Sequence, residues 1–269
     1  MKPGNISIIF LIIIIPFIFI QDMKLNALTA LYNNKVELDK CFESALDDGI
    51  NSLVEVDRNR QIILHKNNAV DQFYTSLYSN FSVVGNENFK NQLKMYIPII
   101  LITDNDGFYI FYSITEINEG DKFLTQNFSE KTTYLFEDEH YIYNFTLNDY
   151  IFVYNKNGFK ISEGQYKDVL NNLNNSSLNY DNYYEIKNNT ITNIIEKEMN
   201  YYIKEHNHIA KQFGIEYEFW LPEIDRDDWY RTIGDIGLMV IMQGYPFDMV
   251  GNRYNRVGIT GSRIKKRTM

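Results

Sequence analysis

Residues 96–114 read YIPIILITDNDGFYIFYSI, two apolar runs on either side of Asp104-Asn105-Asp106-Gly107. An Asp-Gly turn between β-branched and aromatic runs is a strong short-range signal for a β-hairpin. The pattern recurs in TTYLFEDEHYIYNFTL (132–147), which we expect to turn near Asp138, and in DYIFVYNKNGFKIS (149–162), which we expect to turn at Asn157-Gly158. Three successive hairpins predict an antiparallel β-meander over residues 96–162.

Helical patterns flank this meander. Before it, apolar residues recur at three- and four-residue steps from Leu25 to Leu53, and again from Asn68 to Phe81. After it, we expect a short helix over 165–173, an Asn-rich loop over 171–193, and a helix from Thr192 that Gly214 ends. Four further segments are predicted towards the end: a strand in IEYEFW (215–220), a helix capped by Asp225 and running to Ile233, a buried strand or short core helix over Ile236–Phe247, and a last strand in YNRVGITGSRI (254–264).

The amino-terminal segment ISIIFLIIIIPFIFI (6–20) contains no charge. As a helix, the stretch from Pro3 spans about 27 Å at about 1.5 Å per residue, close to a hydrocarbon core of about 30 Å. We therefore predict a transmembrane anchor over residues 1–24, carried by Ile8, Phe10, Leu11, Ile14, Pro16, Phe17 and Ile20. Lys2 places the amino terminus in the cytoplasm and the bulk of the chain outside a cell membrane crossed once. A cleaved signal peptide is the alternative, and it also exports the remainder.

The helical period continues past the anchor, so Ile8 to Leu53 is predicted to be one nearly continuous helix that Gly49 ends or bends. The expected fold class is α+β: a transmembrane helix that continues into an amphipathic stalk, then an antiparallel β-meander with flanking helices. We divide the chain into the anchor (1–24), a helical stalk with a second helix (25–95) and an extracytoplasmic α+β domain (96–269). The stalk offers a candidate face for protein partners, formed by Leu25, Leu28, Tyr32, Val36 and Phe42.

The net charge of −9 and the pI near 5.0 argue against general nucleic-acid binding. The basic residues near the end are candidates for contact with anionic lipid or cell-wall polymer, with a solubilising terminus as the alternative: Arg263, Lys265, Lys266 and Arg267. Cys41 is the only cysteine, so no intrachain disulfide forms, and its neighbours predict a buried or half-buried helical position.

Two motifs resemble metal sites. Asp104 to Gly107 resembles the start of a calcium loop, but Phe108 and Thr115 stand where an EF-hand loop needs an oxygen ligand and a Glu. His206 and His208 diverge by about 200° on a helix, because residues two apart do not share a face. We interpret the first as a turn and the second as exposed helix surface.

Two acidic clusters are candidates for chemistry. Glu137-Asp138-Glu139-His140 falls at a predicted hairpin tip, where it either binds a cation or forms a solvated turn. A second group precedes Trp229 and suits either a glycosidase pair or a helix cap: Glu223, Asp225, Asp227 and Asp228. No phosphate loop, serine elbow or Cys-His nucleophile stands out. We expect no catalytic activity, metal or cofactor, and a small-molecule ligand has no specific support.

A larger pattern runs through most of the chain. It comprises the anchor, FYTSLYSNF (73–81), LKMYIPIILITDNDGFYIFY (93–112), NFTLNDYIFVY (144–154) and LPEIDRDDWYRTIGDIGLMVIMQGYPF (221–247). This order resembles a group of uncharacterised single-pass membrane proteins of clostridia and related Firmicutes, associated with pilus- or secretion-type envelope assemblies. The resemblance implies no catalytic residue.

Two architectural likenesses follow. An anchor that continues into a stalk below an antiparallel sheet is similar to pilins and pseudopilins. The chain departs from the prepilin processing pattern, because Gly4 is followed by Asn5 and the apolar run holds no Glu. A long helix before a sheet with an Asp-x-Asp-Gly hairpin is similar to PAS-like Cache sensor modules, which would here signal through a partner chain because only about five residues precede the anchor.

The functional prediction is a membrane-anchored component of an envelope apparatus that acts by contact with other envelope proteins or with itself. The alternatives are a Cache-like ligand-binding sensor and a cell-wall glycan hydrolase built around Glu223 to Asp228.

Overall fold

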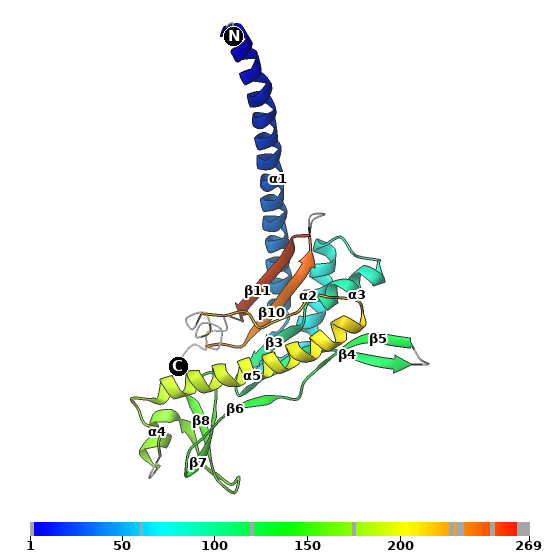
Figure 1. Cartoon of the computed structure of the whole chain (residues 1–269). Coiled ribbons are helices and arrows are strands. Elements are labelled where there is room, and N and C mark those ends of the chain that lie inside the picture. Colours follow the sequence, from blue (N-terminus) through cyan, green and yellow to red (C-terminus); the bar gives the residue numbers. More distant parts are fainter. Residues whose placement is uncertain are drawn as a thin grey trace.

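The computed structural model describes residues 3–59, 61–118, 121–173, 176–225, 229, 234–247 and 251–262. A single long helix, α1 (Pro3–Asn51, 49 residues), projects from an α+β body (Figure 1). At about 1.5 Å per residue it is about 73 Å long. The predicted near-continuity of this helix is confirmed, and it runs through Pro16 without a break.

The body is built on an antiparallel sheet with the strand order β11-β10-β3-β4-β6-β7-β8-β9, and β5 pairs with β4 off this path. A separate hairpin, β1 (Val54–Val56) and β2 (Ile62–Leu64), follows α1. The strands of the main sheet are β3 (Ile99–Asp104), β4 (Gly107–Asn118), β5 (Asp121–Phe128), β6 (Thr132–Glu137), β7 (Tyr141–Phe145), β8 (Tyr150–Asn155), β9 (Lys160–Gln165), β10 (Gly237–Pro246) and β11 (Arg253–Gly261).

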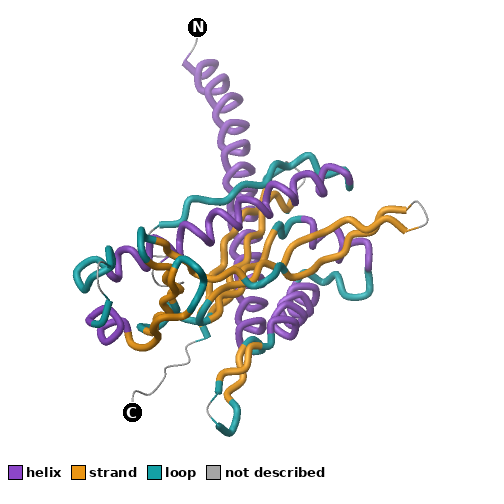
Figure 2. Tube along the Cα trace, turned by 90° about the horizontal axis from the view of Figure 1, so that it is seen from below, coloured by secondary structure: helices purple, strands orange, loops and turns teal. Residues whose placement is uncertain are grey.

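The three predicted hairpins are present as β3–β4, β6–β7 and β8–β9. The sequence did not predict β5. Only the first two residues of β4 pair with β6, whereas Phe111 to Asn118 pair with β5. The outer part of β4 and β5 therefore form a two-stranded ribbon that reaches away from the body (Figures 1 and 2).

The central strands are covered on both faces. Ile99 to Thr103 of β3 and the first eight residues of β10 are all buried, which explains their unbroken apolar sequence. The end of α1 packs on β10 and β11, and α5 (Tyr183–Gln212) packs on β3, β4 and β6. The segment Ile236–Phe247 is thus mainly a strand, one of the two structures expected there.

Two glycines bring α1 into close contact with the body. A Cβ on Gly258 of β11 would lie 2.0 Å from Cδ1 of Leu46 and 2.7 Å from Cε1 of Phe42. A Cβ on Gly49 of α1 would lie 2.9 Å from Cδ2 of Leu238 and 3.1 Å from the carbonyl oxygen of Ala69. Gly49 does not end the helix, which continues to Asn51; it lets α1 approach its neighbours.

The remaining helices are α2 (Lys66–Asn80), α3 (Glu87–Met95) and α4 (Tyr166–Asn171). The second and the short predicted helices are confirmed as α2 and α4. Helix α3 was not predicted; Asn86 caps it by accepting a hydrogen bond from the Phe89 amide at 3.2 Å.

Helix α5 begins nine residues before the predicted Thr192, so the expected loop over 171–193 is wrong in its second half. Its buried stripe includes Tyr183, Lys187 and Ile191. Because Lys187 is charged, it interrupts the apolar period, and the sequence therefore did not predict the first part of the helix. The Lys187 ammonium donates to the carbonyl oxygens of Leu147 at 3.1 Å and Asn148 at 2.5 Å. Burial lowers the pKa of Lys187 to about 8, partly offset by Asp149. Gly214, with φ +80°, follows the helix end as expected.

The segment 215–220 alternates like a strand but pairs with no strand among the described residues. The side-chain amide of Asn207 takes that role: its Oδ1 accepts from the Phe219 amide at 2.7 Å and its Nδ2 donates to the Phe219 carbonyl at 2.8 Å. The Gln243 side chain accepts from the Trp220 amide at 3.1 Å. The strand prediction is therefore wrong. The helix predicted from Asp225 to Ile233 lies largely outside the described residues.

Candidate functional site

The half of α1 that precedes the body exposes its apolar side chains. Leu25, Leu28 and Tyr32 are 62%, 63% and 69% exposed. Their spacing of three and four residues places them within about 60° of one another around the helix. We call these three residues the stalk face.

The apolar window in this half has the length and composition of a membrane span, and none of it is buried. A signal sequence near an amino terminus has the same properties. Ile8, Phe10 and Leu11 lie in α1, although their side chains are outside the described part, while Pro16, Phe17 and Ile20 are exposed and Ile14 is partly exposed. The chain therefore has one amino-terminal apolar helix compatible with a membrane anchor.

The stalk face lies beyond this apolar run. If the hydrocarbon core ends near Ile20, Leu25 is about 8 Å beyond it and Tyr32 about 18 Å beyond it. The headgroup layer is only about 5–8 Å thick on each side. With the hydrocarbon core placed in this way, lipid does not cover Leu28 and Tyr32, and their exposure shows that the described body does not cover them either.

Two cavities adjoin the stalk where it meets the body. One, of about 340 Å³, is lined by Leu31, Tyr32 and Lys35 of α1 and by residues at the end of the β10–β11 hairpin. The other, of about 500 Å³, is lined by α1, the end of α2 and the end of β10, and includes Cys41. Because Tyr32 belongs both to the stalk face and to the first cavity, the apolar face continues into a hollow of the body.

Two members of the predicted partner face differ from the others. Val36 is half-buried, and Phe42 is fully buried in contact with Phe73, their rings 6.1 Å apart. The Phe42 prediction is therefore wrong, because the helix enters the body before that position. Cys41 is half-buried as expected; its Sγ lies 3.7 Å from the Asn80 carbonyl oxygen.

The carboxylates of the turn from Asp104 to Gly107 are paired with the ammonium group of Lys131. The Lys131 ammonium bonds Oδ2 of Asp104 at 2.7 Å and also pairs with Asp106. Burial opposes the lysine charge, but the hydrogen bonds to both carboxylates outweigh it and raise the pKa of Lys131. A Cβ on Gly107 would lie 2.5 Å from the Thr132 carbonyl oxygen, so this turn requires glycine. The lysine occupies the position that a calcium ion would need.

His206 and His208 do not act together. His206 is buried, and its Nε2 donates to the Met95 carbonyl at 2.8 Å, whereas His208 is exposed. Burial lowers the pKa of His206 to about 4. The expected divergence is confirmed, but exposure of both rings is wrong, because one of them packs against Phe219 at 4.8 Å between ring centroids.

Asp138 organises the β6–β7 turn. Its carboxylate accepts hydrogen bonds from the amides of His140 and Tyr141, both at 2.8 Å, and from Ser177 at 3.0 Å. Partial burial opposes ionisation, but these bonds and one from the Tyr143 hydroxyl hold the pKa of Asp138 well below its usual range. With a further bond from the Ser177 hydroxyl, these bonds hold the β6–β7 turn together and attach it to the segment at Ser177, so Asp138 has a structural role.

The second acidic group lies at a cavity of about 610 Å³ between α5 and the segment before Trp229. Glu196, Glu223 and Asp225 line it, together with Trp229, whose buried Nε1 has no hydrogen-bond partner in the part of the chain that the structure describes. Asp227 and Asp228 lie outside the described residues, as do Arg263, Lys265, Lys266 and Arg267. Within the described chain no group of His, Cys, Asp and Glu could hold a metal ion. The hydrolase alternative therefore stays a prediction.

Comparisons with protein-family models, curated proteins and solved structures give no match. The resemblance to envelope proteins of Firmicutes therefore stays a prediction, and function must be inferred from the surfaces of this chain.

Proposed function

We propose that this protein is a membrane-anchored component of an extracytoplasmic assembly and acts by contact with other proteins through the stalk face. The observation that carries the proposal is the exposure of Leu25, Leu28 and Tyr32 on one side of α1, past the uncharged apolar run that ends at Ile20. Burial of each such side chain by a partner contributes about 1.5–3 kcal/mol. A monomer in solution does not gain this free energy, because the three side chains stay exposed to water.

The shape of the molecule supports the proposal. One helix joins the apolar segment to the body, so a neighbour that packs beside the stalk also fixes the distance of the body from the membrane (Figure 1). The adjoining cavity at Leu31, Tyr32 and Lys35 provides room for the end of a partner helix or a large side chain. The β4–β5 ribbon offers a second surface, because the outer edge of β5 has no strand partner among the described residues.

The orientation follows from the amino-terminal charge. Lys2 precedes the apolar segment, which favours a cytoplasmic amino terminus and an outward body. Retention of the anchor is tested by mass spectrometry of the membrane-bound protein. A tryptic peptide that begins at Met1 and ends at Lys24 supports an anchor, because trypsin does not cleave between Lys2 and Pro3. A mature terminus after residue 20 supports a signal peptide.

Contact through the stalk face is tested by photocrosslinking in native membranes. A photoreactive amino acid replaces Leu28 in one full-length variant and Ala30, which is exposed on the opposite side of α1, in a matched control. We expect discrete adducts from position 28 and few from position 30, and their masses distinguish a second copy from another envelope protein. Monomer alone at both positions, or equal unspecific labelling, contradicts the proposal.

A further inference from the structure

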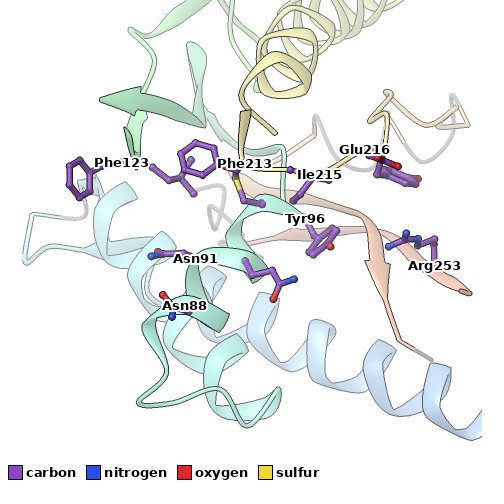
Figure 3. A pocket seen from close by; sticks show the side chains of 13 residues that line it. Asn88, Asn91, Tyr96, Phe123, Phe213, Ile215, Glu216 and Arg253 are labelled. Atoms are coloured by element: carbon purple, nitrogen blue, oxygen red, sulfur yellow. The ribbon is translucent and has the colours of Figure 1, made fainter. Parts of the chain in front are cut away.

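The body contains a cleft that the assembly role does not use. This cleft, of about 610 Å³, lies between α3, the segment that follows α5, the start of β5 and the start of β11. Its volume is in the range of about 300–1,000 Å³ that small-molecule sites occupy. In Figure 3, Phe123 and Phe213 lie at one end and Arg253 at the other, with Tyr96 between them. We call it the amide cleft after the side chains on its α3 wall.

Three carboxamides form that wall. Asn88, Asn91 and Gln92 are exposed, share one face of α3 by their spacing of three and four residues, and make no side-chain hydrogen bond among the described residues. Each carboxamide offers two donors and an acceptor in one plane. Glu216 lies across the cleft, also without a partner in the described chain. The cleft thus presents three carboxamides that both donate and accept hydrogen bonds, and one carboxylate that accepts them.

The charge of the cleft excludes strongly ionic ligands. Glu216 and Arg253 are the two ionisable side chains of opposite sign that line it, and they balance. The guanidinium of Arg253 is partly committed, because its Nη1 donates to the Gly244 carbonyl at 3.2 Å. A phosphate or sulfate group would require more positive charge. A neutral ligand with many hydroxyl groups satisfies the carboxamides without leaving a charge unpaired.

Aromatic rings provide the apolar surface. Phe123 and Phe213 are 49% and 38% exposed, and Tyr217 contributes a third ring. Tyr217 is held in place: its hydroxyl donates to Oδ1 of Asn255 at 3.0 Å, and its ring packs on Gly244, where a Cβ would lie 2.4 Å from it. Aromatic faces pack against the C–H faces of sugar rings, and a fixed ring binds with less loss of entropy.

We infer that the amide cleft binds a neutral oligosaccharide. Its hydroxyls bridge Asn88, Asn91, Gln92 and Glu216, and its ring faces pack against Phe213 and Tyr217. An extended peptide that adds to the unpaired edge of β5 is the competing occupant, and it would leave the carboxamides of α3 unused. The inference uses the proposed outward orientation of the body only for the source of the glycan, since wall polysaccharide lies on that side.

The test is calorimetric titration of the full-length protein in lipid nanodiscs, which avoids sugar-based detergents that would compete. The probes are short oligomers of N-acetylglucosamine and of glucose. We expect saturable binding of at least one series. The double substitution Asn91→Ala and Gln92→Ala should weaken it by about tenfold or more, since each lost hydrogen bond lowers affinity severalfold. Phe213→Ala should also weaken it.

The matched control is Phe89→Ala, on the same helix but outside the cleft, and it should bind as the wild type does. Alanine favours the helix and Asn86 still caps it, so the double variant keeps its fold, which circular dichroism checks. Failure of both glycan series to bind, unchanged affinity in the double variant, or binding of an unstructured peptide instead would overturn the inference. Crosslinking at Leu28 is independent of all three outcomes.

Discussion

The two halves of α1 carry similar side chains in different surroundings. Leu25, Leu28 and Tyr32 are more than 60% exposed, whereas Phe42, Leu46 and Ile50 are no more than 7% exposed. The first set repeats at steps of three and four residues and the second at steps of four, so each set lies on one side of the same helix. The second set contacts the strands that Gly258 and Leu238 belong to, and the first set has no partner within the described chain. The proposed function accounts for this difference by a partner outside the chain that covers the free half.

The largest effect is expected in the packed half. Phe42→Ala removes a fully buried ring that contacts Phe73 and leaves a cavity between α1 and β11. We expect a loss of about 3–5 kcal/mol in the free energy of unfolding. Urea denaturation of the full-length protein, monitored by circular dichroism, measures it. A loss below about 1 kcal/mol would show that α1 is not part of the core.

A smaller effect is expected from acid, which should act on the body and not on the stalk. Buried His206 has a pKa of about 4 in the folded protein against 6.5 when unfolded, so the unfolded chain binds more protons between these values. Stability is therefore fully present above pH 6.5 and falls by up to about 3 kcal/mol as the pH drops to 4. Urea midpoints at pH 7 and 4.5 measure this, with His206→Gln expected to flatten the dependence. The exposed His208→Gln should not, and equal slopes in the two variants would contradict the assignment.

At the turn between β3 and β4 the expected effect is smaller still. Lys131→Met leaves Asp104 and Asp106 adjacent without their cation. Because these groups are partly exposed, we expect a loss of about 1 kcal/mol in the free energy of unfolding. Calcium should leave the Tm of the wild-type protein unchanged. A rise in Tm with added calcium would show that the lysine is displaced and that this turn is a metal site.

The smallest effect is expected on the free half. Leu28→Ala removes a side chain that is 63% exposed, so we expect a change within about 0.5 kcal/mol in the stability of the purified protein. The same urea titration measures it. A loss comparable to that of Phe42→Ala would contradict the comparison, because Leu28 would then have to be packed within the chain.

Local sequence signals predicted much of this fold. The apolar period from Leu25 to Leu53 predicted the long helix. Asp106-Gly107 and Asn157-Gly158 predicted two of the hairpins, because the conformation of a tight turn depends on only a few neighbouring residues. Strand β5, DKFLTQNF, was missed because most of its residues are polar and it pairs on a ribbon that has little core to face.

Tertiary contacts decided the rest. Lys187 interrupts the apolar stripe of α5, and only its two carbonyl partners explain its burial. Apolar and polar residues do alternate over 215–220, but the backbone of Phe219 pairs with the side-chain amide of Asn207 and not with a neighbouring strand. The exposed stalk face was predicted from its spacing, whereas the end of that face at Phe42 depends on where the body begins. The amide cleft joins residues from 88 to 253, and no local pattern indicates it.

The central claim is that a partner outside this chain covers the stalk face. Single cysteines at Leu28 and Ala30, in a Cys41→Ser background, test it with a membrane-impermeant maleimide applied to intact cells and to the purified protein. We predict that position 30 reacts in both samples, and that position 28 reacts in the purified protein but is protected in the membrane. Equal reaction of both positions in intact cells would contradict the account, because the stalk face would then be free where the protein works.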